Sequence, residues 1–193
     1  MPNSVPTTKH AMRDQILASR RQRSLADSVA DAEAIADHVL AWDVVRRGAT
    51  IAAYASVGRE PGTGLLLAAL LAAGKRVLLP VLRADNDLDW VAFTGDLAPA
   101  TRGLLEPVGP LLGVNAIHSV EVVLAPGLAA SWDGDRLGRG GGSYDRALAR
   151  VAAGVPVGLL LHDDETGRDV PTEPHDHRVT HVVTPGGVLV LSP

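Results

Sequence analysis

Residues 50–80 constrain the fold most strongly, because they carry a strand–helix–strand pattern within a short stretch. Thr50 to Tyr54 is an apolar run typical of a strand, and Arg76 to Pro80 is a second one. Between them, Thr63 is a plausible helix N-cap and Gly74 a plausible helix end. Two strands joined through a helix lie parallel with a right-handed crossover. This stretch therefore predicts an α/β fold.

The same alternation continues along the chain. Helices are expected over about 8–24, 25–42 and 144–153, and further strands over 88–93, 121–125, 155–161, 180–183 and 188–191. We predict one domain over residues 1–193 with an α/β, three-layer architecture, in which helices cover both faces of a mainly parallel, open, Rossmann-like sheet. Ligands bind such sheets beyond the carboxyl ends of the strands, so the loops after residues 54, 80, 125 and 161 are expected to share one site. These loops carry Glu60, a glycine-rich run and His162.

The composition excludes several classes of protein. The 193 residues are 46% hydrophobic and 21% charged, as in ordinary soluble globular proteins, and they include no cysteine, which removes disulfides, thiolate metal sites and cysteine nucleophiles. A net charge of −4 argues against sequence-independent binding of nucleic acid. Met1 to Lys9 lacks the apolar core of a secretory signal, and the longest apolar run, Leu65 to Ala73, is half of a membrane span. We therefore expect a cytoplasmic protein without a membrane partner, and a monomer, because no heptad pattern stands out.

The run from Arg136 to Arg146 contains the strongest functional motif. Four of the seven residues 138–144 are glycine, and Tyr144-Asp145-Arg146 opens a predicted helix. Glycine lets backbone N–H groups approach a ligand closely, and such groups bind phosphate when arginines assist them. A flexible surface linker is the alternative, but linkers seldom carry clustered arginines. The run lacks the Gly-Lys pair of a P-loop and the third glycine of a dinucleotide-binding loop, so a nucleotide would bind in another way.

Two segments outside this run carry groups that suit a phosphate or a heterocycle. Lys9 and Arg13, at i and i+4, share one face of the first predicted helix, where they either bind a polyphosphate or form a solvated charged face. Glu60 stands just before a predicted helix. Its carboxylate either favours the helix N-terminus or accepts two N–H donors from a heterocyclic ligand.

The C-terminal segment carries candidate metal ligands. His175, His177 and His181 suggest a zinc site, but no strong helical context brings them together. Asp145 and Asp176 suit a hard cation better, since Mg²⁺ takes one or two carboxylates together with substrate phosphates. The sequence thus favours magnesium over zinc.

Taken in chain order, these segments resemble the 5-formyltetrahydrofolate cyclo-ligase family, also called methenyltetrahydrofolate synthetases. The resemblance runs over nearly the whole chain and rests on Lys9-x-x-x-Arg13, Tyr54-x-Ser56 with Glu60 and Thr63, Leu79-Pro80, Glu106-Pro107, Ala125-Pro126-Gly127, the run 136–146, Val157-Gly158 and Glu173-x-His175-Asp176. The specific part is the glycine-rich run followed about thirty residues later by Glu-Pro-His-Asp.

The resemblance implies an ATP- and Mg²⁺-dependent ligase of one-carbon metabolism, which closes 5-formyltetrahydrofolate to 5,10-methenyltetrahydrofolate and releases ADP and phosphate. In the family's reaction the formyl oxygen attacks the γ-phosphate to make a phosphorylated imidate. N10 then attacks the activated carbon, and phosphate leaves. Such chemistry needs positioning and charge neutralisation rather than a protein nucleophile.

The resemblance also implies roles for individual residues. The ATP-binding set would be Lys9, Arg13, Arg136, Gly138, Arg139, Gly140, Gly141, Gly142, Ser143, Tyr144, Asp145 and Arg146. The folate would contact Tyr54, Glu60 and Tyr144, with Glu60 accepting the amino and ring N–H groups of the pterin. Asp145 and Asp176 would bear on Mg²⁺, directly or through water.

The chain departs from the family pattern in three loops. Ser143 stands where a tyrosine is common, Ala130-Ser131 where a Phe-Asp pair is common, and Leu161 to Glu165 where an acidic or aromatic stretch is common. These changes bear on substrate contacts and rate more than on the reaction class. Two alternatives stay open: a non-catalytic folate- or nucleotide-binding protein, and a sugar-phosphate isomerase or CoA-transferase-like α/β enzyme with Glu60 or Glu106 as its base.

Overall fold

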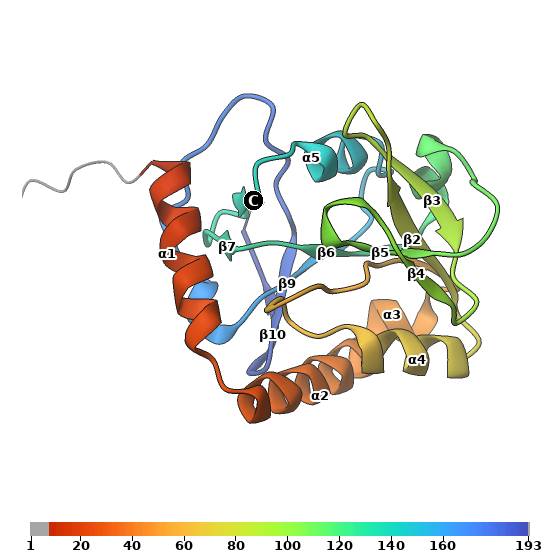
Figure 1. The fold of residues 1–193 in the computed structure, drawn as a ribbon, viewed down its shortest axis with the longest axis horizontal. Helices are drawn as coiled ribbons and strands as arrows, with labels where there is room; N and C mark the ends of the chain where they lie inside the picture. The colour runs from red at the N-terminus through yellow and green to blue at the C-terminus, as the bar shows by residue number, and fades with distance from the viewer. Residues whose placement is uncertain (1–7, 193) are drawn as a thin grey trace, which may run out of the picture.

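A seven-stranded sheet forms the centre of the molecule (Figure 1). The structure, a computed structural model, describes residues 8–192, so most of the segment Met1 to Lys9 lies outside the described residues. The strand order is β11-β10-β9-β6-β1-β2-β3, in which the strands from β10 to β2 run parallel and the two edge strands run antiparallel to their neighbours. Their bounds are β1 Thr50–Ala52, β2 Arg76–Leu82, β3 Leu88–Ala92, β6 Val122–Pro126, β9 Val157–Leu160, β10 His181–Thr184 and β11 Gly187–Val190. The predicted mainly parallel α/β sheet is confirmed.

Helices and small hairpins surround this sheet. The α-helices are α1 Lys9–Gln22, α2 Leu25–Ala41, α3 Asp43–Arg47, α4 Gly64–Ala72 and α5 Ser143–Leu148, and the 3-10 turns are η1 Thr101–Gly103, η2 Val114–Ser119 and η3 Asp163–Glu165. Two short antiparallel pairs complete the fold, β4 Leu97–Pro99 with β5 Leu105–Pro107 and β7 Ala129–Ala130 with β8 Arg136–Leu137. None of the helices within residues 8–192 has the length and apolar character required to cross a bilayer.

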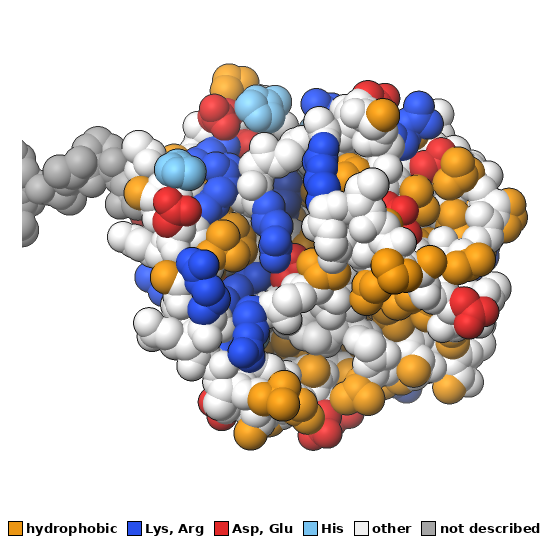
Figure 2. Space-filling view, in the orientation of Figure 1, with side chains coloured by type: hydrophobic (Ala, Val, Ile, Leu, Met, Phe, Trp, Pro, Cys, Tyr) orange, Lys and Arg blue, Asp and Glu red, His pale blue; other side chains and the backbone are white. Residues whose placement is uncertain are grey.

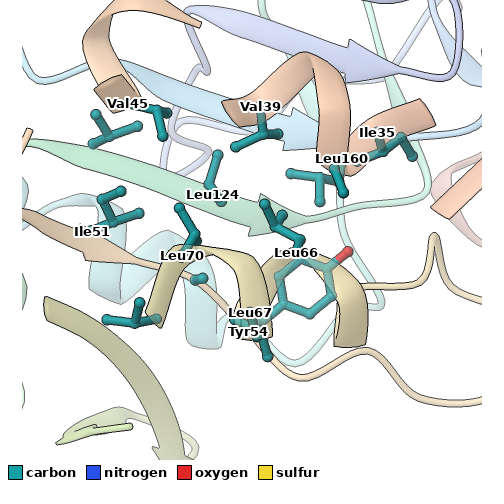
Figure 3. Packing of buried hydrophobic residues seen from close by; sticks show 14 of the residues in the cluster. Ile35, Val39, Val45, Ile51, Tyr54, Leu66, Leu67, Leu70, Leu124 and Leu160 are labelled. Atoms are coloured by element: carbon teal, nitrogen blue, oxygen red, sulfur yellow. The ribbon is translucent and has the colours of Figure 1, made fainter. Parts of the chain in front are cut away.

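Both faces of the sheet are buried, as the apolar strand sequences require. On one face, Leu66 and Leu70 of α4 and side chains of α2 and α3 pack with the strand residues Ile51 and Leu124 (Figure 3). Neighbouring strand residues point to the other face, where Val123 packs with short α5, η2 and the C-terminal segment. Runs of Val, Leu and Ile that are covered on both sides are typical of parallel sheets.

Helix α1 stands to one side of the sheet rather than on a face (Figure 1). Its N-cap is Thr8, whose hydroxyl accepts a hydrogen bond from the backbone N–H of Ala11. Met12 and Ile16 pack against Leu128 and Leu137 in the β7–β8 region, which forms a small separate apolar cluster. The helix therefore lies beside the loops that follow the parallel strands.

Two local predictions were wrong. The helix expected over 144–153 ends at Leu148, because Arg150 and Val151 bond back three residues and so tighten the next turn. Thr63 does not cap α4 with its side chain. Its hydroxyl accepts the N–H of Ser56 at 2.8 Å, while the Ser56 hydroxyl accepts the N–H of Thr63 at 2.9 Å, so the pair fastens the loop after β1.

Candidate active site

The carboxyl ends of three parallel strands open into one pocket of about 560 Å³. Tyr54 follows β1, Pro80 lies in β2 and Pro126 ends β6, and all of them line the pocket. Glu60 and the glycine-rich loop form further walls. The expected convergence of these loops is confirmed. His162, which follows β9, is the exception: it is buried next to Asp31, with its Nδ1 at 2.8 Å from the carboxylate, and is not part of the pocket wall.

The glycine-rich loop depends on glycine at two points. Gly140 has φ 97° and Gly142 φ 68°, a left-handed region that other residues seldom adopt, and Gly142 directly precedes α5. A Cβ on Gly140 would also lie 3.3 Å from the guanidinium carbon of Arg13. Arg13 donates from Nε to the carbonyl oxygen of Gly138 at 2.8 Å. The first helix thus brings a cation onto the loop, as the sequence suggested.

Two arginines of the loop region form ion pairs with pocket carboxylates. Arg136 contacts Oδ1 of Asp145 at 2.7 Å and lies over the ring of Tyr144, with 5.9 Å to its centroid. Arg139 contacts Oε1 of Glu60 at 3.0 Å, and the other oxygen of Glu60 accepts the N–H of Val57 at 2.9 Å. Glu60 therefore closes its own loop and faces the pocket, and it does not act on the N-terminus of α4.

Several buried polar atoms of the pocket wall have no hydrogen-bond partner within residues 8–192. They are the hydroxyls of Tyr54 and Tyr144 and Nε of Arg136. Burial raises the pKa of both tyrosine hydroxyls, so they are donors rather than phenolates. Buried polar groups are usually satisfied, so these three add hydrogen-bonding capacity to the pocket wall that the protein itself does not use.

Lys9 lies in a second cluster of charges beside the loop. Its ammonium contacts Oε2 of Glu173 and Oδ2 of Asp176, both at 2.6 Å. Burial alone would lower the pKa of Lys9, but the hydrogen bonds that Lys9 donates to Asp176 and Glu173 outweigh it, so that pKa is raised. Burial alone would raise the pKa of Asp176, but the hydrogen bonds from Lys9 and from the backbone N–H of Glu173 outweigh it, so that pKa is lowered. Glu173, His175 and Asp176 bring potential metal-ligand atoms within 4.8 Å of one another.

The predicted magnesium ligands come from two different parts of the site. Asp145 lines the pocket and is held by Arg136, whereas Asp176 lies in the turn that also carries Glu173. His181, which the sequence grouped with His175 as a possible metal ligand, packs against Trp42, with ring centroids 4.7 Å apart.

Sequence reasoning missed a buried ion pair under the pocket. Arg20 of α1 donates from Nε and Nη2 to the two carboxylate oxygens of Glu165 at 2.7 and 2.8 Å, and Nη2 also reaches the carbonyl of Gly127 at 2.7 Å. Arg20 is 2% exposed and Glu165 3%. The sequence signals only a basic helix and an acidic loop, and nothing in it says which arginine meets which carboxylate.

The remaining arginine of the loop region lies further out. Nη1 of Arg146 is 3.4 Å from the carbonyls of both Asn86 and Gly141. Figure 2 shows lysine and arginine side chains gathered beside α1 and toward the centre of that face. The site is therefore a cavity with a basic rim, although the whole chain carries a net charge of −4.

A mainly parallel sheet whose carboxyl edge carries a glycine-rich loop, arginines and one pocket defines an α/β protein with a candidate ligand site at that edge. Residues 5–185 match the model of the 5-formyltetrahydrofolate cyclo-ligase family. The curated 5-formyltetrahydrofolate cyclo-ligase of Mycolicibacterium smegmatis is 41% identical over 193 residues, which cover 96% of this chain and 98% of that protein. The enzyme of the same name from Escherichia coli is 31% identical over 159 residues, 79% of this chain and 87% of the relative. This chain belongs to the 5-formyltetrahydrofolate cyclo-ligase family.

Solved structures agree with the fold. The 5,10-methenyltetrahydrofolate synthetase of Aquifex aeolicus superposes with a TM-score of 0.81 at 23% identity, covering 96% of this chain and 93% of that one. The synthetase of Mycoplasma pneumoniae gives 0.73 at 20% identity, covering 92% and 98%.

Proposed function

We propose that this protein is a 5-formyltetrahydrofolate cyclo-ligase, which uses ATP to convert 5-formyltetrahydrofolate to 5,10-methenyltetrahydrofolate with release of ADP and phosphate. The observation that carries the proposal is that Arg136 and Arg139 line the same pocket as Glu60 and the glycine-rich loop, while Arg13 contacts that loop at Gly138. One wall suits a triphosphate, and the other offers a carboxylate to a heterocycle with adjacent N–H donors.

In this proposal the cationic groups bind the triphosphate and the carboxylate of Glu60 binds the pterin. Backbone N–H groups of the loop, with Lys9, Arg13, Arg136, Arg139 and Arg146, hold the triphosphate. The carboxylate of Glu60 orients the pterin so that its formyl oxygen faces the γ-phosphate. An O–P bond then forms as the bond to ADP breaks, after which N10 attacks the formyl carbon, loses its proton, and phosphate leaves. Each step needs alignment and charge neutralisation, and none requires a nucleophile from the protein.

The carboxylates of this chain suit Mg²⁺. Asp145 and Asp176 supply hard oxygen ligands, and Arg136 and Lys9 each occupy only one oxygen of these carboxylates. When bound, Mg²⁺ neutralises charge on the β- and γ-phosphates. Lys9, which pairs with Asp176 and Glu173, would lie beside such an ion and would add positive charge for the phosphates.

The direct test mixes the purified protein with ATP, Mg²⁺ and 5-formyltetrahydrofolate, and follows methenyltetrahydrofolate by its near-ultraviolet absorbance and ADP by a coupled assay. We expect both products in equal amounts, and neither when ATP or the folate is omitted. ATP and folate binding without turnover would instead support the non-catalytic binding protein. Turnover of a sugar phosphate without ADP release would support the isomerase alternative.

A further inference from the structure

Arg102 occupies an unusual position at the edge of the pocket. It lies in η1, at the tip of the β4–β5 hairpin, with φ 58° and ψ 23°. A residue other than glycine in this left-handed region is uncommon, and such strain concentrates at ligand-binding sites. Arg102 also lines the same pocket as Glu60.

The guanidinium of Arg102 is held by a neutral group. Its Nη1 donates to Oδ1 of Asn86, in the β2–β3 turn, at 2.9 Å. Within residues 8–192, no carboxylate lies at ion-pair distance from Arg102. By contrast, Arg136 and Arg139, which line the same pocket, each pair with a carboxylate, Asp145 and Glu60 respectively. Arg102 is therefore a positive charge at the pocket mouth that is not neutralised by the protein.

An apolar wall connects this charge to the rest of the site. Leu104 and Leu105 follow Arg102 in the hairpin, and Leu88 lies in β3, and all of them line the pocket. A folate has a polar pterin, a flat benzoyl ring and a glutamyl end with carboxylates. With the pterin at Glu60, the apolar wall suits the ring and the cation suits the far end.

We propose that Arg102 binds a carboxylate of the glutamyl end of the folate, in place of its contact with Asn86, and so makes the enzyme prefer substrates that carry this group. The inference rests on the proposed function, because it takes the folate as the occupant of the pocket. Arg146 contacts the backbone carbonyl of Asn86 at 3.4 Å, whereas Arg102 contacts its side chain, so the two arginines use different atoms of this turn.

The test compares kcat/KM for 5-formyltetrahydrofolate with that for 5-formyltetrahydropteroate, which lacks the glutamate. Arg102→Gln removes the charge, and Arg102→Gly does so while relieving the left-handed backbone, so a folding defect is not expected in the glycine variant. Arg83→Gln is the matched control, because it removes the same charge from the neighbouring turn, where Asp89 already pairs with it.

We expect the wild type and Arg83→Gln to prefer the glutamylated substrate by about tenfold, the lower end for a partly exposed charge-assisted hydrogen bond. Both Arg102 variants should lose this preference, with unchanged turnover of the pteroate and unchanged KM for ATP. Equal turnover of the two substrates by the wild type, an unchanged preference in the Arg102 variants, or the same loss in Arg83→Gln would overturn the inference. If the wild type turns over neither compound, the proposed function fails. The inference about Arg102 is then tested by equilibrium binding: the wild type should bind the glutamylated compound about tenfold more tightly than the pteroate, and Arg102→Gly should bind both equally.

Discussion

Glu60 and Arg139 face each other across the pocket, and their ion pair joins the side that suits the folate to the side that suits ATP. The Arg139 side chain is 55% exposed and that of Glu60 9%, so the arginine is free to move toward a phosphate while Glu60 is held by its own loop. The two partners should therefore affect different substrates.

Arg139→Ala should raise the KM for ATP at least about tenfold, since it removes a charge-assisted contact to phosphate, and should leave the KM for 5-formyltetrahydrofolate within about threefold. Glu60→Gln should show the reverse pattern. Steady-state kinetics with each substrate varied in turn measures both. If each substitution weakens both substrates equally, the pair has only a structural role.

His181 predicts a pH dependence of stability. Burial against Trp42 lowers the pKa of its imidazole below the usual 6.5. Above pH 6.5 the ring is neutral in both the folded and the unfolded chain. As the pH falls from there toward the lowered pKa, the unfolded chain takes up the proton first, so the free energy of unfolding decreases.

Urea unfolding between about pH 5 and pH 7.5 measures this effect. His181→Phe keeps a ring against Trp42 and should flatten the loss of stability on the acid side. His10→Gln, at an exposed position of α1, is the control and should keep the slope of the wild type. An unchanged slope in His181→Phe would assign the pH dependence to another group.

Among individual residues, the sequence predicted the candidate site residues that lie in recognisable motifs and missed the contacts that no motif marks. Arg13, Arg136 and Glu60 were identified because a glycine run and a familiar spacing surround them. The pairing of Arg139 with Glu60 could not be predicted, because the chain offers many carboxylates to each arginine and only the folded backbone chooses among them.

Among the elements, α1 is the one whose position the site depends on most. Arg13 near its start lies on the glycine-rich loop, while Arg20 near its end is tied to Glu165 and to the carbonyl of Gly127 in the pocket wall. The buried ion pair therefore helps to fix the helix end that carries Lys9 and Arg13, the residues that we propose for phosphate binding.

Arg20→Met should destabilise the protein by about 3 kcal/mol or more, because it leaves Glu165 as a buried charge without its partner. Denaturant unfolding measures this, and the KM for ATP should rise with it, since Arg13 loses its fixed position. Arg21→Met, on the exposed face of the same helix, should change stability by no more than about 0.5 kcal/mol. Similar stabilities of the two variants would mean that the other contacts of α1, its apolar packing and the pairs of Lys9 and Arg13, hold the helix without Arg20.

Strands were easier to predict than helix ends. Runs of consecutive apolar residues, such as the one within Arg76 to Pro80, identify a strand from the local sequence alone. The end of α5 could not be predicted in this way. It depends on a tightened turn and on Arg150, which pairs with Asp87 of the β2–β3 hairpin at 2.6 Å. Thr63 was predicted as a helix N-cap because threonine is common at that position. In the folded loop its hydroxyl instead accepts a hydrogen bond from the backbone N–H of Ser56, a contact that the sequence does not show.

For the whole molecule, topology made the location of the site predictable. Parallel strands point their carboxyl ends to one edge, so loops far apart in sequence had to meet there. The shape of the pocket was not predictable in the same way, because its outer wall comes from the β4–β5 hairpin around Leu104 and Arg102, a stretch without a clear pattern.

The same pocket architecture predicts cooperation between the two substrates. ATP would draw Arg139 away from Glu60, and the pterin would occupy the carboxylate of Glu60, so either ligand must break their ion pair. The ligand that binds first loses the free energy needed to break the ion pair. The second ligand then binds a residue that is already unpaired. The coupling free energy should be favourable and the same in both directions, of the typical size of about 1 kcal/mol or somewhat more. Titration calorimetry of a non-hydrolysable ATP analogue, with and without 5-formyltetrahydrofolate, should show about fivefold tighter binding when the folate is present. In Glu60→Gln, which has no charge to pair with Arg139, most of this gain should vanish. An analogue affinity that the folate leaves unchanged in the wild type would mean that the ion pair persists when the substrates bind, and that the two halves of the pocket act independently.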